Sequence, residues 1–363
     1  MAMTASFLNK YSGKKVLITG DTGFKGSWLA IWLLKLGARV TGFGLPPKTR
    51  EDNFTVCGLQ AKNDHIEGDI RDLTQLSDAI GESRPDFVFH LAAQALVFDS
   101  YRDPYQTFTS NVTGTLNVLE AIRKSSGIKA AVMVTSDKCY ENHEWVHGYR
   151  ETDPLGGRDP YSASKGAAEI VISSYIRSFF HEKNTPAVAS VRAGNVIGGG
   201  DWSENRIIPD CIRSLRSKHS IELRNPDSVR PWQHVLEPLY GYLMLGSALA
   251  GPVGKTFCGA WNFGPYPCNA VTVEDLVKEI ISQWGSGMYH IKKSQSRNKE
   301  SGMLVLDINK AVHLLNWNPV LPLKKSLQFT IEEYRIVGLS EDAVYHQRSA
   351  HIDEYMNIQR SMG

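Results

Sequence analysis

Several features that mark particular classes of protein are absent from the 363-residue chain or scarce in it. No pair of its five cysteines has Cys-x-x-Cys spacing, so we expect reduced thiols, no disulfide framework and no metal site. The cysteines are Cys57, Cys139, Cys211, Cys258 and Cys268. The formal net charge is only +2, which indicates neither a nucleic-acid partner nor an anionic membrane surface.

Long hydrophobic runs are also missing. The most apolar stretch, Trp28 to Leu34, is far too short to span a bilayer. Residues 1–13 lack the apolar segment of a signal peptide, so we expect a cytoplasmic protein with no membrane partner. Hydrophobic residues make up 42% and charged residues 21%, as in an ordinary folded protein, and the length predicts two lobes rather than one core.

A glycine-rich turn follows the first predicted strand. Residues 14–19 read as a buried strand, and residues 20–26 then give the pattern G-x-x-G-x-x-G at the start of an apolar helix over 27–36. Glycines permit the tight turn and let the backbone approach a pyrophosphate, whose charge faces the helix N-terminus. Strand, turn and helix occur in the required order, so the sequence predicts a dinucleotide site rather than a structural turn. The predicted cofactor contacts here are Gly20, Gly23, Phe24, Lys25 and Gly26.

The second predicted strand, residues 39–43, departs from the dinucleotide fingerprint. It ends in Gly42-Phe43-Gly44-Leu45, without the acidic residue that usually contacts the adenosine ribose. No arginine stands at the strand tip either, although Lys48 and Arg50 follow and could meet a 2′-phosphate. NAD is therefore favoured over NADP, and the missing carboxylate predicts looser cofactor binding.

Strands and helices alternate through the first half of the chain. Further strands are predicted at residues 65–68, 86–91, 130–135 and 187–191, and helical spacing occurs at 71–81 and 104–125. This alternation predicts an α/β fold with a doubly wound parallel (Rossmann) sheet, whose ligands bind at the carboxyl ends of the strands.

Two clusters of polar residues stand where this architecture places chemistry. Ser136, Asp137 and Lys138 come directly after a predicted strand, and Tyr161 is followed four residues later by Lys165. On a helix, that spacing puts the phenol and the amine on one face. Tyr-x-x-x-Lys also occurs by chance in many helices, and the serine could merely satisfy the strand end. Together, these groups suit the removal of a hydroxyl proton while a hydride leaves the same carbon.

Over nearly its whole length, the chain resembles the extended short-chain dehydrogenase/reductase family of nucleotide-sugar enzymes. The segments that carry the resemblance are 20–26, Asp69-Ile70, Leu91-Ala92-Ala93-Gln94, the Ser136 region, Tyr161 with Lys165, 192–196, 206–210 and 230–235. The resemblance implies that NAD is used catalytically and that the chain forms a homo-oligomer, a dimer or a tetramer. The implied cofactor contacts beyond the glycine-rich turn are Asp69, Ile70, Leu91, Ala92, Ala93, Tyr161 and Lys165.

The resemblance also implies a nucleotide-sugar substrate. Arginine binds phosphate through a bidentate fork, so Arg206 and Arg230 are candidate ligands of the substrate pyrophosphate or ribose. Either arginine alone is more often a solvated surface charge. Gln94 and Asn195 could orient the hexose through hydrogen bonds.

The implied domain organisation has two interleaved parts. Residues 1–195 would form the NAD-binding Rossmann domain, and a later strand near 231–263 would return to it. Residues 196–340 would form a smaller C-terminal lobe that mainly binds substrate. Residues 341–363 are polar and read as a tail without a functional signal.

Asp137 and Lys138 specify the reaction that the resemblance implies. Epimerases of the family usually carry a non-ionisable residue after the catalytic serine or threonine, and the 4,6-dehydratases of thymidine sugars carry Asp-Glu. Asp-Lys resembles the cytidine enzymes, which implies the conversion of CDP-glucose to its 4-keto-6-deoxy product. In that reaction Tyr161, helped by the Lys165 charge, is the base at the 4-hydroxyl, and Ser136 hydrogen-bonds the same oxygen. By position, Lys138 would act at C5 and Asp137 at the C6 leaving group.

Other interpretations of the same residues stay open at this point. Asp137 and Lys138 could be a surface ion pair between sequence neighbours. The chain could be a sugar epimerase or reductase on the same fold, or a 4,6-dehydratase for another nucleotide sugar. A non-enzymatic NAD-binding regulator is a further alternative, because a fold does not dictate function.

Overall fold

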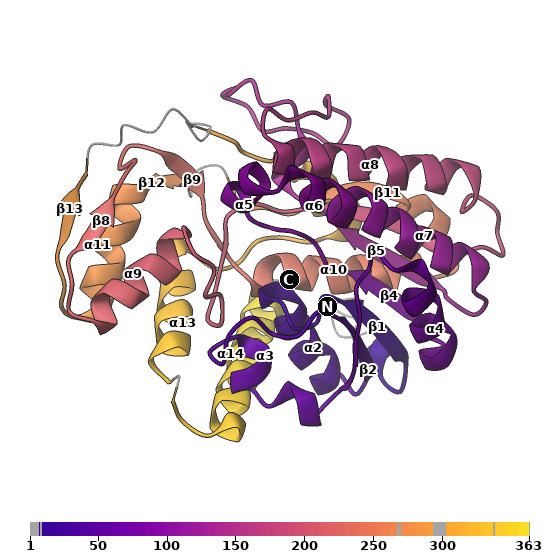
Figure 1. Cartoon of the computed structure of the whole chain (residues 1–363), viewed down its shortest axis with the longest axis horizontal. Helices are drawn as coiled ribbons and strands as arrows, with labels where there is room; N and C mark the ends of the chain where they lie inside the picture. Colours follow the sequence, from indigo (N-terminus) through magenta and orange to yellow (C-terminus); the bar gives the residue numbers. More distant parts are fainter. Residues whose placement is uncertain (1–6, 8, 267–269, 293–302, 337, 363) are drawn as a thin grey trace.

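The protein is built on one central sheet, with a smaller group of strands and helices at its side (Figure 1). The computed structural model describes residue 7 and residues 9–266, 270–292, 303–336 and 338–362. Cys57, Cys139, Cys211 and Cys258 are unbonded, and Cys268 lies outside the described residues. Within these ranges, no helix combines the length and apolar character needed to cross a membrane, and no cluster of His, Cys, Asp and Glu side chains is arranged to hold a metal ion.

The central sheet contains seven parallel strands in the order β11-β6-β5-β4-β1-β2-β3. They are β1 (Lys15–Thr19), β2 (Arg39–Gly44), β3 (Asp64–Glu67), β4 (Phe87–His90), β5 (Ala130–Val134), β6 (Ala187–Arg192) and β11 (Gly259–Asn262). The β1 side chains of Val16, Leu17 and Ile18 are at most 1% exposed, because helices cover both faces of the sheet. The predicted doubly wound parallel sheet is confirmed.

Two layers of helices enclose the sheet. One layer, with α4, α7 and α8, packs on the face that carries Leu17 and Val88. The other, with α2, α10, α12 and α14, packs on the face that carries Val16 and Ile18. The helices are α2 (Phe24–Lys35), α3 (Asn53–Val56), α4 (Leu73–Ser83), α5 (Val97–Arg102), α6 (Pro104–Phe108), α7 (Gly114–Lys124), α8 (Pro160–Ser178), α9 (Ile207–Arg216), α10 (Leu236–Leu249), α11 (Val273–Trp284), α12 (Asn309–Leu315), α13 (Leu323–Arg335) and α14 (Glu341–Met362).

The second lobe has a separate small core between α9, α11 and α13. Its short strands pair as β9 (Val229–Pro231) with β12 (Ala270–Thr272), and as β8 (Ile221–Leu223) with β13 (Tyr289–Ile291). The chain enters this lobe after β6, returns to the central sheet through α10 and β11, and then enters the lobe again at β12 and α11. The smaller lobe is therefore interleaved with the sheet, as predicted.

The segment 341–363 differs from the polar tail that its composition suggests. Residues 341–362 form α14, which packs against α2, α3 and α13. Its buried residues include Val344, Ile352 and Tyr355, and the Tyr355 ring meets the edge of Trp32 with centroids 5.7 Å apart. The buried stripe also contains polar side chains, among them Arg348, so the apolar period is weak in the sequence.

A buried carboxyl group joins α14 to α10. Glu237 accepts hydrogen bonds from the backbone N–H groups of Val320 (2.8 Å) and Leu321 (2.6 Å) and from the Tyr355 hydroxyl (2.8 Å). Burial raises the pKa of Glu237 to about 7, although these hydrogen bonds favour the carboxylate. A carboxyl whose pKa is raised by folding stabilises the protein fully below its unfolded pKa of about 4.3, and this contribution is lost as the pH rises toward 7.

Glu237→Gln should remove this part of the pH dependence of stability. The amide resembles the protonated acid and does not ionise, so the variant should gain about 3 kcal/mol relative to the native protein between about pH 4.5 and pH 7.5. Urea unfolding at both pH values measures the difference, with the exposed Glu82→Gln as control. The same pH dependence in native protein and Glu237→Gln would contradict the prediction.

Candidate active site

The glycine-rich turn between β1 and α2 is too tightly packed for side chains at two of its glycines. Gly20 has a φ of +77°, and a Cβ there would lie 2.7 Å from the Ala92 backbone. A Cβ on Gly26 would lie 2.0 Å from the Gly20 carbonyl oxygen. Gly23 is the N-cap of α2, and no side chain caps the first turn of the helix. The turn therefore leaves backbone N–H groups facing the space where a pyrophosphate would bind.

A carboxylate lies beside the tip of β2, although β2 itself supplies none. A Cβ on Gly42 would lie 1.8 Å from Oδ2 of Asp21, the residue that follows the first glycine of the turn. Asp21 is fully buried; its Oδ2 lies 2.9 Å from Nδ1 of His65 and accepts a hydrogen bond from Asn63 at 3.3 Å. Hydrogen bonding to Asp21 raises the pKa of His65. Asp21 could not be recognised from the fingerprint, which places the acid at the end of the second strand and not in the glycine-rich turn.

The first two turns of α8 carry the Tyr-x-x-x-Lys pair. Pro160 occupies the first helical position, and Asp159 caps the helix by accepting hydrogen bonds from the Ser162 backbone (2.9 Å) and hydroxyl (2.6 Å). Tyr161 and Lys165 are both buried and lie one turn apart. Burial lowers the pKa of Lys165 to about 8, against the opposing charge of Glu169.

The end of β5 brings three further predicted residues to the same place. Ser136 Oγ donates to Asp137 Oδ1 at 2.9 Å, accepts from the Lys138 backbone N–H at 3.2 Å, and is also hydrogen-bonded to Tyr161. Asp137 is buried against Gly194, where a Cβ would come within 1.9 Å of its Oδ2. Burial raises the pKa of Tyr161 to about 12; the Ser136 hydrogen bond opposes this shift, and the Asp137 charge adds to it. Lys138 is half-buried beside this cluster.

Lys25, from the glycine-rich turn, lies near the residues of the predicted catalytic cluster, which are Ser136, Asp137, Tyr161 and Lys165. Burial and the neighbouring charges of Arg206 and Lys165 lower the pKa of Lys25 to about 8, and Asp137 opposes the shift. From the sequence, Lys25 was predicted only as a cofactor contact of the glycine-rich turn. The turn itself needs only glycines. The presence of a lysine at position 25 was therefore the signal that this residue also faces other charges.

A buried ion pair lies next to Lys165, one turn further along α8. Glu169 pairs with Arg192 of β6 at 2.8 Å and accepts hydrogen bonds from Thr135 and from Ser190 (2.7 Å). Every polar partner of this carboxylate is buried, so its position is tightly fixed. Glu169 was missed by the sequence analysis, although Tyr161, Lys165 and Glu169 recur at the four-residue spacing of one helix face.

The predicted substrate residues lie in different environments. Arg206, the N-cap of α9, pairs with buried Asp201 at 2.8 Å and keeps 36% of its side chain exposed. Its charge acts on Tyr161 and Lys25, which places it beside the catalytic cluster. Arg230 lies on β9 in the second lobe and donates to the Val229 carbonyl at 3.1 Å.

The two predicted amide residues are held in different ways. The Gln94 side chain bonds the backbone of Leu96 through both of its polar atoms, at 2.9 and 3.0 Å, so its amide is turned onto its own loop. Asn195 adopts a left-handed conformation with a φ of +46°, and its carbonyl accepts from the Gln233 N–H at 3.2 Å.

The remaining predicted cofactor residues follow β3 and β4. Asp69 is paired with Arg71 at 2.6 Å, and Ile70 is buried against Gly114. Leu91, Ala92 and Ala93 follow β4, and Ala92 forms the wall against which Gly20 packs.

A parallel Rossmann sheet with a glycine-rich turn after β1, a strand-end serine after β5 and a Tyr-x-x-x-Lys pair on α8 defines an extended short-chain dehydrogenase/reductase. The family model described as GDP-mannose 4,6 dehydratase matches residues 17–330, and the chain belongs to that family.

Two curated relatives and one solved structure illustrate the similarity. The chain is 44% identical over 353 residues to a CDP-glucose 4,6-dehydratase of Salmonella typhimurium, which covers 96% of this chain and 98% of the relative. It is 28% identical to a CDP-paratose 2-epimerase of Salmonella typhi, over 86% of this chain and 97% of the relative. A UDP-glucose 4-epimerase from Thermus thermophilus, solved in complex with NAD, superposes with a TM-score of 0.74 at 25% identity and covers 88% of this chain and 99% of its own.

Proposed function

We propose that the protein is a lyase that converts CDP-glucose to CDP-4-keto-6-deoxyglucose with a bound NAD. The observation that carries the proposal is Asp137, buried between the strand-end Ser136 and Gly194, with an amine-bearing residue, Lys138, directly after it. Elimination of water needs a base and an acid beyond the groups that oxidise the sugar. The 44% identity to a CDP-glucose 4,6-dehydratase over nearly the full length supports the same substrate.

The residues present fit an NAD molecule. The packed glycines, chiefly Gly20 and Gly26, leave space for a pyrophosphate at the uncapped start of α2, and Ala92 closes the other side of the turn. Lys165 would hold the nicotinamide ribose, and Lys25 would bring a second cation to the same region. When bound, NAD accepts the hydride from C4 of the sugar and returns it to C6.

The first proton transfer belongs to Tyr161. The phenol must lose its proton near neutral pH, and its pKa of about 12 in the buried site shows that it needs added positive charge. Lys165, one turn along α8, and Arg206, whose charge lowers the Tyr161 pKa, supply part of that charge. Ser136 hydrogen-bonds Tyr161 and would hold the same sugar oxygen, so the proton can pass directly from the 4-hydroxyl to the phenolate.

The second and third proton transfers belong to Lys138 and Asp137. Once C4 is a ketone, the C5 proton is acidic, and we assign its removal to the Lys138 amine. Asp137 then protonates the C6 hydroxyl, which leaves as water. When the hydride adds to C6, the Lys138 ammonium would return its proton to C5, and the proton held by Tyr161 would restore the Asp137 carboxyl group. The charge of Asp137 opposes the lowering of the Lys25 pKa, so a second amine would lie near the carboxyl group that acts at C6.

We also propose the substrate contacts and the assembly. Arg206 and Arg230 would bind the pyrophosphate or ribose, and Asn195 would orient the hexose. Gln94 could join Asn195 only by releasing its two hydrogen bonds to the Leu96 backbone. Residues 1–195 together with β11 would form the cofactor domain, residues 196–340 would mainly bind substrate, and the reduced thiols suit a cytoplasmic setting.

A homo-oligomer, a dimer or a tetramer, would cover an exposed apolar face. The face lies on α5, α6 and α8, where Tyr105 is 79% and Ile170 59% exposed. Phe98 and Tyr101 of α5 extend the same set of exposed large side chains. Exposed apolar side chains of this number are typical of subunit contacts.

Isotope transfer tests the reaction. CDP-glucose with deuterium at C4 should give a product with deuterium at C6, because the hydride leaves and returns within one active site. Product analysis by NMR measures it, and dTDP-, GDP- and UDP-glucose serve as comparison substrates. Deuterium lost to solvent, or a stoichiometric need for added NAD, would contradict the mechanism; preference for another base would contradict only the substrate.

A further inference from the structure

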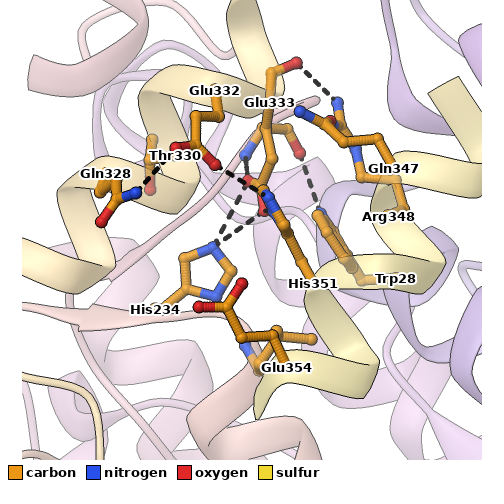
Figure 2. A network of polar contacts seen from close by, with 12 residues as sticks. Trp28, His234, Gln328, Thr330, Glu332, Glu333, Gln347, Arg348, His351 and Glu354 are labelled. Atoms are coloured by element: carbon orange, nitrogen blue, oxygen red, sulfur yellow. Dashed lines mark hydrogen bonds and ion pairs between the residues drawn. The ribbon is translucent and has the colours of Figure 1, made fainter.

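A buried polar network outside the catalytic cluster joins α13, α14, β10 (Gln233–His234) and α2 (Figure 2). At its centre is Glu333, a fully buried residue of α13. Its carboxylate accepts a hydrogen bond from the Gly199 backbone N–H at 2.6 Å. It also lies 2.8 Å from Nδ1 of His351 and 3.3 Å from Nε2 of His234. A carboxylate removed from water needs such partners to stay ionised.

His351 holds Glu333 in its charged form. The two ring nitrogens of His351 face two carboxylates, Glu333 at 2.8 Å and Glu332 at 3.1 Å. Only an imidazolium donates to both at once. Burial opposes this charge, but the hydrogen bond and charge of Glu333, with the charge of Glu332, raise the pKa of His351. Burial would likewise raise the pKa of Glu333, but His234, His351 and Arg348 hold it well below its usual range.

The peptide groups of Gly199 are fixed from both lobes. Its N–H is held by Glu333 of α13, and its carbonyl accepts a hydrogen bond from the Trp28 indole of α2 at 2.9 Å. A Cβ on Gly199 would lie 2.4 Å from Cβ of Glu333 and 2.9 Å from a guanidinium nitrogen of Arg348. The backbone therefore runs directly over the network, with no space for a side chain.

The residues that follow Gly199 connect the network to the active site. Tyr334, adjacent to Glu333, donates its hydroxyl to the Asp201 carbonyl. The Asp201 carboxylate holds Arg206 at 2.8 Å. Glu333 and Tyr334 together thus locate the segment that ends in Arg206, whose charge acts on Tyr161 and Lys25.

The other side of the network leads to the glycine-rich turn. Arg348 donates to the Asn53 side-chain oxygen at 3.1 Å, and the Asn53 amide donates to the Ser27 hydroxyl at 3.2 Å. Ser27 in turn donates to the Phe24 carbonyl at 2.9 Å, in the first turn of α2. One buried network therefore contacts both the cofactor turn and the segment that carries Arg206.

We infer that Glu333, held in its ionised form by His351, is a positioning residue for Arg206 and so for the diphosphate of the nucleotide-sugar substrate. The inference rests on the proposed function for the identity of that substrate. Glu333 does not contact the reacting atoms. It acts through Gly199 and Asp201, so its loss weakens substrate binding more than the chemical step.

Glu333→Gln tests the inference. The amide keeps the size of the side chain but loses the charge, so the hydrogen bond from the Gly199 N–H is weakened and the second oxygen that faces His351 becomes an NH₂ group. We expect KM for CDP-glucose to rise about tenfold and kcat to change by less than about threefold, the pattern of an interaction made equally in ground and transition states. An unchanged KM, or a fall in kcat at unchanged KM, would overturn the inference.

A double-mutant cycle separates positioning from general damage. If Glu333 acts through Arg206, adding Glu333→Gln to Arg206→Ala should raise KM by less than about twofold, whereas independent effects would multiply. Multiplied effects would overturn the inference. Glu354→Gln on α14, which breaks only the exposed pair with Lys325 (2.6 Å), is the matched control and should leave KM unchanged. If Glu333→Gln does not fold, His351→Gln carries the same test with the same expected direction.

Binding of CDP separates this inference from the proposed function. Calorimetric titration of CDP needs no turnover, and Glu333→Gln should weaken it by a similar factor. No turnover of CDP-glucose by the native protein, together with CDP binding that is weakened by Glu333→Gln, would contradict the function and support the positioning role. Normal turnover by the native protein, together with a CDP affinity that Glu333→Gln leaves unchanged, would support the function and contradict the positioning role.

Discussion

Tyr161→Phe should lower kcat for CDP-glucose by about 10²- to 10⁴-fold, the range of a lost general base. The phenol of Tyr161 is buried, hydrogen-bonded to Ser136 and one helical turn from Lys165. Phenylalanine keeps the ring and its packing but cannot take the proton from the 4-hydroxyl. We therefore expect KM and the melting temperature to change little, because the loss is confined to the transition state.

The same helix supplies a matched control for this substitution. Tyr175 of α8 donates its hydroxyl to Glu120 at 2.7 Å, away from the catalytic cluster. Tyr175→Phe should therefore retain kcat within about twofold, as substitutions away from a reacting centre usually do. Initial rates of 4-keto product formation and thermal unfolding of both variants provide the comparison. A Tyr161→Phe enzyme with more than a tenth of native kcat would show that another group takes the proton.

Asp137→Asn and Lys138→Met should each lower kcat by about 10²- to 10⁴-fold, but they should stop the reaction at different steps. Without Asp137, the C6 hydroxyl lacks its acid, although C4 oxidation and C5 deprotonation continue. Without Lys138, C5 deprotonation itself fails. In D₂O, the CDP-glucose recovered from Asp137→Asn should therefore carry deuterium at C5, whereas that from Lys138→Met should not.

NMR of the recovered sugar nucleotide distinguishes the two outcomes. Lys129→Met, at a surface lysine paired with Asp86 at 2.8 Å, is the control and should turn over normally. Deuterium at C5 with Lys138→Met but not with Asp137→Asn would show that Asp137 is the base at C5 and Lys138 the acid at the C6 hydroxyl. Turnover of either active-site variant within about tenfold of the native rate would contradict dehydration by this pair.

The fold class and much of the site could be predicted because their signals are local. A strand, a turn and a helix that are adjacent in sequence predict the dinucleotide-binding turn with Gly20 and Gly26. The helical period places Tyr161 and Lys165 on one face, and the parallel sheet brings Ser136 to the same edge.

What could not be predicted depends on contacts between distant segments. The charge of Asp137 acts on Lys25 because β1 and β5 end at the same edge of the sheet, and nothing in the sequence around either residue indicates this interaction. Asp21 takes its place beside Gly42 only because β2 has no side chain there. The burial of Glu333 could not be predicted, because its partners Gly199 and His351 come from a loop and from a helix of weak apolar period.

The docking of α14 on α2 also has a consequence for biosynthesis. Trp28 and Trp32 of α2 are fully buried, and Trp32 packs against Tyr355 of the last helix. α2 leaves the ribosome long before α14, the helix that packs on it. Until α14 emerges, Trp32 lacks its contact with Tyr355, and exposed apolar side chains lead nascent chains to associate wrongly or to recruit chaperones. Variants that lack α14 should therefore yield protein that aggregates.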